Sequence, residues 1–240
     1  MSLCINNELI WVSVPKCASI SIETALTNSS LPISYYKKPM FYDKGIHTHI
    51  KLDTLHDYFG FKESVCIKRN ASERWVSGLR HWWWTMESHS MNPIIPFNEI
   101  DNNFIYKYFT DDLINKIYTY DPLYIGNGNG DIDIEYVNMK KELNTLFSSE
   151  KNKKILVFLP LLLLSQLFWT CGAKCTHEFD FKKIHLFEEF ISNRYNVKFK
   201  LPHLNSKTDT HTNIIIDDKF ENWVETKFEK RFEKKQNKLI

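Results

Sequence analysis

Short apolar runs alternate with helical patterns in the first third of the chain. Residues 8–14 form a continuous β-prone run that ends at Pro15, which predicts a strand buried on both faces and central in a sheet. Residues 19–27 then carry apolar positions at helical spacing, and the small hydroxyl residues of their first turn are suited to capping. The pattern predicts a strand, a tight loop and a helix.

The same order returns further along the chain. Residues 51–61 have the helical period and follow a His-Thr-His segment, which we expect to lie on a loop. Residues 64–68 predict a second core strand, after which Asn70 or Ser72 can cap a long helix. Of the three consecutive tryptophans in that helix, we expect at least two in the core. Its apolar stripe consists of Trp75, Val76, Leu79, Trp82 and Trp83.

The pattern beyond residue 90 is less regular. Residues 91–130 alternate turn residues with aromatic helical fragments, and we assign them to loops and acceptor-side structure. Residues 155–169 predict a buried helix, because this apolar run is short for a bilayer and contains polar residues. We see no repeat or linker, so a single α/β domain over residues 1–240 is expected. Further predicted elements are a strand at 183–186, a helix at 187–195 and an amphipathic helix at 217–235.

Composition limits the classes of partner. The 31 basic and 29 acidic residues nearly cancel, so no overall field attracts nucleic acid or an acidic membrane, and an anion must be held locally. The first residues lack the pattern of a signal peptide, and five cysteines at irregular spacing suit a reducing compartment. We therefore expect a cytoplasmic protein without a membrane span; its oligomeric state is open.

The first segment with chemistry joins the first predicted strand to its helix. It offers backbone N–H groups, two hydroxyls and one lysine, Lys16, which together suit a phosphate at a helix N-terminus. A Walker A loop is excluded because the segment has no glycine. The alternative is an ordinary strand-to-helix turn. The segment reads Val14-Pro15-Lys16-Cys17-Ala18-Ser19-Ile20-Ser21.

The second segment follows the second predicted strand. An arginine fork, Arg69, can grip a phosphate through two N–H bonds, and Ser77 can add a hydroxyl from the following helix. The alternative is that Arg69 and Arg74 are ion-pairing groups at the surface. The segment reads Lys68-Arg69-Asn70-Ala71-Ser72-Glu73-Arg74-Trp75-Val76-Ser77.

In this order, the two segments resemble the donor-binding motifs of sulfotransferases that use PAPS (3′-phosphoadenosine 5′-phosphosulfate). The first is similar to the 5′-phosphosulfate loop Pro-Lys-Thr-Gly-Ser-Thr-Ser, with Cys17 and Ala18 in place of Thr-Gly. The second is similar to the 3′-phosphate motif Arg-Asn/Asp-Pro-x-x-Arg-x-x-Ser, with Ala71 in place of Pro. The resemblance implies that PAPS is bound by Pro15, Lys16, Cys17, Ala18, Ser19, Ile20, Ser21, Arg69 and Ser77.

A histidine pair lies between the two motifs. The segment His47-Thr48-His49 resembles one in the carbohydrate branch of the family, heparan-sulfate 2-O-sulfotransferase in particular, where it supplies the catalytic base. His49 matches that base better than His47, and a neutral imidazole of pKa near about 6.5 can accept a hydroxyl proton. The pair could instead bind a metal or be polar loop residues, although further ligands at a standard zinc spacing are not evident.

Two later segments also look like the family. Residues 164–172 are similar to a Gln-containing apolar segment of the heparan branch, which we expect to be structural. Residues 201–207 resemble a stretch that folds over the nucleotide, which makes Lys207 a candidate donor contact or else a solvated loop lysine.

The resemblance implies a P-loop-NTPase-like three-layer sandwich with a mainly parallel central sheet. It also implies direct in-line sulfuryl transfer to a hydroxyl without a metal, with His49 taking the proton and Lys16 stabilising the leaving oxygen. The product nucleotide would be PAP (3′-phosphoadenosine 5′-phosphate). We expect a carbohydrate acceptor, though the aromatic middle could line a pocket for a lipid or a small alcohol. The alternatives are a P-loop-type small-molecule kinase and a non-catalytic nucleotide-binding protein.

Overall fold

The computed structural model describes residues 2–36, 50–88, 93–119, 147, 163–172, 174–202 and 212–231. Within them a five-stranded mixed sheet has the order β3-β1-β2-β4-β5. β2, β4 and β5 pair in parallel, whereas β1 is antiparallel to both β2 and β3. The predicted α/β class is confirmed. The strands are β1 (Leu3–Ile5), β2 (Leu9–Trp11), β3 (Ile33–Tyr35), β4 (Glu63–Lys68) and β5 (His177–Asp180).

The central strand is the one that the first apolar run predicts. β2 lies in the middle of the sheet, and every residue from Leu9 to Val14 is buried. Its parallel ladder with β4 pairs Trp11 with Val65 and continues through the Val12 N–H, which donates to the Val65 carbonyl at 2.9 Å. A strand covered on both faces needs no polar alternation, which explains the unbroken apolar run.

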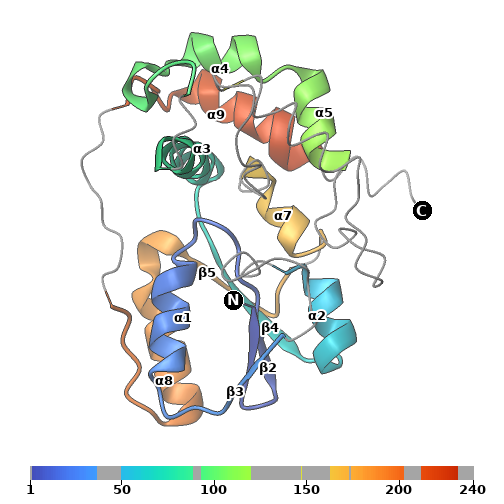
Figure 1. Ribbon diagram of the computed structural model, residues 1–240. Helices are drawn as coiled ribbons and strands as arrows, with labels where there is room; N and C mark the ends of the chain where they lie inside the picture. Colours follow the sequence, from blue (N-terminus) through green and yellow to red (C-terminus); the bar gives the residue numbers. More distant parts are fainter. Residues whose placement is uncertain are drawn as a thin grey trace.

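Helices lie on both sides of the sheet and beyond one end of it. α1 and α8 lie on one side and α2 on the other, while α3, α4, α5 and α9 gather beyond the sheet (Figure 1). The helices are α1 (Ser19–Thr27), α2 (Leu52–Phe59), α3 (Ala71–Ser88), α4 (Asn102–Tyr108), α5 (Asp111–Thr119), α7 (Gln166–Trp169), α8 (His185–Tyr195) and α9 (Asp218–Val224). Short 3-10 turns lie at Phe97–Glu99 and Phe181–Lys183, and a π-helical segment, Glu225–Glu229, follows α9.

An aromatic core joins the group of helices beyond the sheet. The buried Trp75 ring of α3 lies 5.2 to 5.8 Å, centroid to centroid, from the rings of Phe109, Phe220, Trp223 and Phe228. Trp82 and Trp83 are also fully buried, whereas Trp84 is half exposed. The prediction that at least two of the three consecutive tryptophans are core residues is confirmed. This packing fixes α3, which carries part of the candidate site.

Most predicted elements in the first third are confirmed. α1 spans the predicted residues 19–27, and the Asn70 side chain caps α3 by accepting the Glu73 N–H at 3.0 Å. The prediction of a hydroxyl cap on α1 is wrong, because the N-cap residue is Ala18 and no side chain caps that end.

Several later predictions are wrong. Residues 183–186 form no strand, since the Asp180 side chain accepts the Lys182 N–H at 2.7 Å and turns the chain into a 3-10 helix. The segment predicted as loops holds α4 and α5, and Asp101 caps α4. Of the helix predicted at 155–169, residues 155–162 lie outside the described residues, and its end is confirmed as α7, which begins at Gln166 after the cap residue Ser165. No helix within the described ranges combines the length and the apolar character that a bilayer span requires.

Candidate functional site

The two predicted phosphate segments meet at one edge of the sheet. β2 and β4 are parallel neighbours, so the loop after β2 and Arg69 after β4 emerge at the same end. In open α/β sheets, ligands bind at the carboxyl ends of such strands. A direct contact joins the segments here, because the Arg69 guanidinium donates from Nη1 to the Lys16 carbonyl oxygen at 3.5 Å.

The loop after β2 has the backbone of an anion-binding nest. Lys16 has φ of 65° and Ala18 has φ of 61°, whereas Cys17 between them has no positive φ. Alternation of this kind points successive N–H groups to one side of the chain, where they can surround an anion. The conformation that glycine adopts without strain is here adopted by Ala18, so the absence of glycine has not removed the loop shape.

The first turn of α1 extends this nest. The first helical backbone bond runs from the Ile22 N–H to the Ala18 carbonyl, at 3.0 Å. The amides of Ser19, Ile20 and Ser21 precede it in the helix, so no intrahelical carbonyl accepts them. With no side chain capping this end, they are available to an anion. The Ile20 side chain is exposed, so its amide is the part that could contribute to binding.

Arg69 is held between a ring and a carboxylate. Its guanidinium carbon lies 4.8 Å from the centre of the Phe181 ring, and its Nε lies 3.4 Å from a Glu73 carboxylate oxygen. The Lys182 ammonium lies 3.0 Å from the other oxygen of Glu73, so this carboxylate is paired with two cations. These contacts orient the Arg69 fork and leave it partly accessible, with 22% of its side chain exposed.

Gln166 fastens the two phosphate segments to α7. Its Oε1 accepts the Arg69 N–H at 2.8 Å, and its Nε2 donates to the Arg69 carbonyl at 2.8 Å. The same Oε1 lies 3.8 Å from the Cys17 thiol, which donates to it. Burial raises the pKa of this thiol to about 12, so Cys17 is a neutral donor. The glutamine expected to be structural therefore positions both loops.

Three cations define an electropositive cluster, Lys16, Arg69 and Arg80. Burial and, to a smaller extent, the nearby charges of Arg69 and Arg80 together lower the pKa of Lys16 to about 8. Burial and the charge of Lys16 lower the pKa of His81 to about 4, so this imidazole is neutral at pH 7. Cations that depress one another favour a bound anion, because it removes their repulsion.

Arg80 and His81 were not among the site residues predicted from the sequence. They lie one helical turn beyond Ser77 on α3, at the i+3 and i+4 positions that share its face. The i+3 and i+4 spacing from Ser77 is the sequence signal that would have indicated both residues. Ser77 itself is half-buried, one turn beyond Glu73 on the same face.

Arg74 has a structural role and does not lie at the surface. Its side chain is fully buried, and it donates to the Leu164 carbonyl at 2.5 Å and faces Glu229 at 3.6 Å. Glu229 also accepts the Ser165 hydroxyl and the Gln166 N–H. The surface alternative for Arg74 is therefore wrong, and the pair braces the segment that carries Gln166.

The remaining predicted residues divide into two groups. Pro15, Cys17 and Ser19 are buried, and Ala18 and Ser21 are half-buried at the start of α1. His47, His49 and Lys207 lie outside the described residues.

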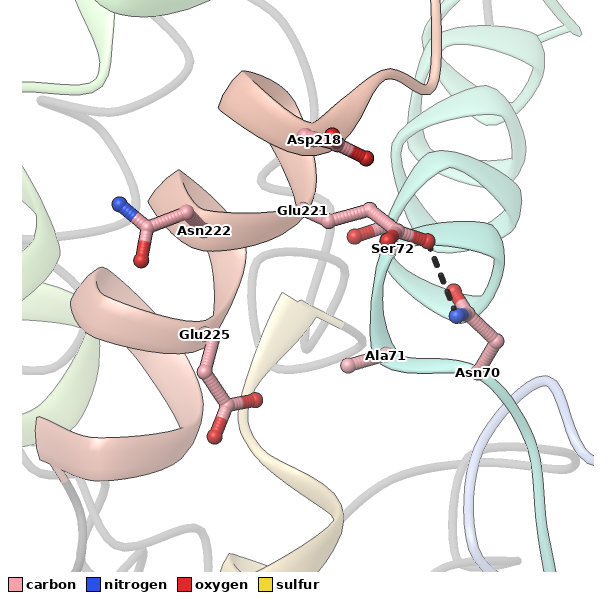
Figure 2. A pocket seen from close by; sticks show the side chains of 7 residues that line it. All are labelled: Asn70, Ala71, Ser72, Asp218, Glu221, Asn222 and Glu225. Carbon is pink, nitrogen blue, oxygen red and sulfur yellow. Dashed lines mark hydrogen bonds between the residues drawn. The ribbon is translucent and has the colours of Figure 1, made fainter.

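A separate pocket of about 390 Å³ lies between the start of α3 and α9 (Figure 2). Asn70 donates to Glu221 across it at 3.2 Å. Three carboxylates on one wall disfavour a phosphate, so this pocket is not part of the candidate anion site. The pocket is lined by Asn70, Ala71, Ser72, Asp218, Glu221, Asn222 and Glu225.

No family model, curated protein or solved structure matches the chain. The function therefore has to be inferred from the chain's own residues.

Proposed function

We propose that the protein is a sulfotransferase that moves a sulfuryl group from PAPS to an acceptor hydroxyl. The observation that carries this proposal is the meeting of the Lys16 nest and the Arg69 fork at one sheet edge, joined by a hydrogen bond of 3.5 Å. PAPS carries two separated anionic groups on one nucleoside, and the two motifs supply one binding element for each.

The 5′-phosphosulfate is assigned to the nest and to the start of α1. There the amides of residues 19–21 and the hydroxyls of Ser19 and Ser21 surround an anion, beside the Lys16 ammonium. The 3′-phosphate is assigned to Arg69 and Ser77, with Arg80 adding positive charge nearby. The partly exposed Arg69 guanidinium, whose Nε meets Glu73, can also grip a phosphate, so this arrangement favours a donor with a 3′-phosphate.

The chemistry is in-line displacement at sulfur. The acceptor oxygen forms a bond to sulfur while the bond from sulfur to the 5′-phosphate oxygen breaks, and PAP leaves. Lys16, with a pKa of about 8, is mostly protonated at pH 7 and stabilises the charge that develops on the leaving oxygen. His49 is proposed as the base that takes the acceptor proton, with His47 as the alternative, and no metal is required.

The finer features of the fold and the acceptor belong to the same proposal. The parallel pairing of β2, β4 and β5, with helices on both sides, is compatible with a P-loop-like three-layer sandwich. A carbohydrate acceptor follows from the histidine pair. A kinase would need an ATP–magnesium site, and the nest lacks the glycines of a Walker A loop.

Calorimetric titration tests the donor site. We expect PAP to bind and ATP with magnesium to bind more weakly. Lys16→Ala and Arg69→Ala should each weaken PAP by about 10- to 100-fold, since hydrogen bonds to charged groups contribute about 1.5–3 kcal/mol. The exposed Lys198 on the segment after α8 provides a control, and Lys198→Ala should leave PAP affinity unchanged. Preference for ATP with magnesium would support the kinase instead.

Transfer itself needs a separate assay. Radiolabelled PAPS is incubated with a panel of glycans and small alcohols, and label in the acceptor is counted. His49→Ala should keep the PAP affinity and lose transfer. PAP binding without transfer to any acceptor would favour a non-catalytic nucleotide-binding protein, and undiminished transfer by His49→Ala would move the base to another residue.

A further inference from the structure

Two thiols and a carboxylate meet on the sheet, outside the anion site. The sulfur atoms of Cys66 and Cys175 and an oxygen of Glu178 all lie within 4.8 Å of one another. Both cysteines are reduced and buried, with Cys66 at 0% and Cys175 at 5% exposure.

Strand pairing accounts for this meeting. Cys66 of β4 is directly opposite Glu178 of β5, so their side chains share one face of the sheet. Cys175 lies just before β5, and its N–H donates to the Glu178 carboxylate at 3.1 Å, which folds it over the same face. Reciprocal hydrogen bonds between Ser64 and Thr176, at 3.1 and 3.2 Å, fasten the segment to β4.

The two thiols have different proton affinities. Hydrogen bonds from Cys66 and Ser64 lower the pKa of Cys175, whereas the hydrogen bond to Cys175 and burial raise the pKa of Cys66. The Glu178 carboxylate raises the pKa of both thiols, and the Lys68 ammonium, 2.8 Å from that carboxylate, offsets part of this effect. Cys175 is therefore the better candidate for the thiolate of the pair, and Cys66 donates a hydrogen bond to it.

We propose that Cys66 and Cys175 are a modification site at which hydroperoxides form an intramolecular disulfide. The Cys175 thiolate attacks a peroxide oxygen, the O–O bond breaks, and a sulfenic acid forms while the departing hydroxide or alkoxide takes a proton from solvent and leaves as water or alcohol. The Cys66 sulfur then attacks the Cys175 sulfur, the S–S bond forms, and the hydroxyl leaves as water with the Cys66 proton. Two sulfurs are oxidised by two electrons in total, and the peroxide is reduced.

A disulfide accounts for these residues better than a metal site does. The described residues supply three ligands at this point, and the Glu178 carboxylate is already paired with Lys68 and with the Cys175 N–H. A structural zinc site has four ligands. The bridge would join the strand that leads to Arg69 to the strand that leads to Phe181, the ring beneath Arg69. The inference does not depend on which anion that site binds.

The test treats the whole reduced protein with hydrogen peroxide and maps its peptides without reductant. We expect a peptide linked through Cys66 and Cys175, a mass lower by 2 Da, and a Tm higher by roughly 5–15 °C, because the bridge closes a loop of about 100 residues. Dithiothreitol should reverse all three. Cys66→Ala and Cys175→Ala should abolish the linkage, whereas Cys4→Ala, on β1, should retain it.

Three results would overturn the inference. The first is a folded protein whose Cys66 and Cys175 stay reduced at peroxide concentrations that link them after denaturation. The second is oxidation that pairs either cysteine with another one. The third is stoichiometric zinc retained by the wild type, lost from both alanine variants and protecting the thiols from peroxide, which would indicate a metal site. The first and second results need no variant, so poor folding of a variant does not weaken the test.

Discussion

Ala18 holds a backbone conformation that costs energy. It has φ of 61° and ψ of 18°, in the left-handed region, where a side chain costs roughly 1–2 kcal/mol. Ala18→Gly removes that cost, but the greater freedom of glycine in the unfolded chain lowers the stability of the folded state by about 0.4–1 kcal/mol. The expected net gain is about 0.5–1 kcal/mol in the free energy of unfolding.

Thermal unfolding followed by circular dichroism measures this gain. For a chain of this size, 1 kcal/mol corresponds to about 2–4 °C, so Ala18→Gly should raise the Tm by roughly 1–4 °C. Ala25→Gly is the matched control, because Ala25 is a buried residue in the middle of α1. There the same substitution should cost about 1–2 kcal/mol through helix propensity and lost burial, and so lower the Tm.

PAP affinity is the second measurement on Ala18→Gly. The nest amides keep their positions when glycine adopts the same φ, so the affinity should change by less than about threefold. A Tm that falls as far for Ala18→Gly as for Ala25→Gly would refute the left-handed conformation at Ala18. Loss of PAP binding by a stable Ala18→Gly protein would refute the view that the nest survives without its glycine.

Three further predictions concern the surroundings of the site. Gln166→Leu removes two strong hydrogen bonds and one weak one, so urea unfolding should show a loss of about 2–4 kcal/mol, together with weaker PAP binding. PAP affinity of the wild type should fall as pH rises through about 8, because Lys16 then loses its proton. Lys16→Arg should remove this fall, since arginine stays protonated. A wild-type affinity that does not change from pH 7 to 9.5 would contradict the lowered pKa of Lys16. Arg74→Met leaves Glu229 buried without its cation and should cost about 3–5 kcal/mol in chemical unfolding, whereas a loss below 1 kcal/mol would contradict the buried pair.

The lowered pKa of Lys16 also makes the stability of the protein depend on pH. Its pKa is about 8 in the folded protein and 10.5 in a free lysine, so between these values the unfolded chain binds more protons. The contribution of Lys16 to the free energy of unfolding without ligand therefore rises with pH across that window.

Local patterns were sufficient for the two strand-to-helix units. The apolar run of β2 and the helix at 19–27 depend on burial and periodicity, which neighbouring residues determine. The strand predicted at 183–186 is wrong because one side chain, Asp180, decides the turn. The helices α4 and α5 were missed because caps such as Asp101 lie within a segment rich in turn residues.

The motifs alone indicated Lys16 and Arg69, but not what holds them. Gln166 is about a hundred residues from Arg69 in the sequence, and its role depends on where α7 packs. Phe181 and Lys182 reach Arg69 and Glu73 from the segment after β5. No spacing rule connects residues so distant in the chain, so tertiary structure was required to find them.

The Gln166 contacts have a consequence for the order of synthesis. A nascent chain that has left the ribosome as far as residue 88 contains both proposed anion-binding motifs but not the side chain of Gln166 that joins them. Glu229, which holds the Ser165 hydroxyl and the Gln166 N–H, emerges later still. The proposed anion site is therefore completed only after residue 229 has been synthesised, and ligand present during translation would find no finished site before that point.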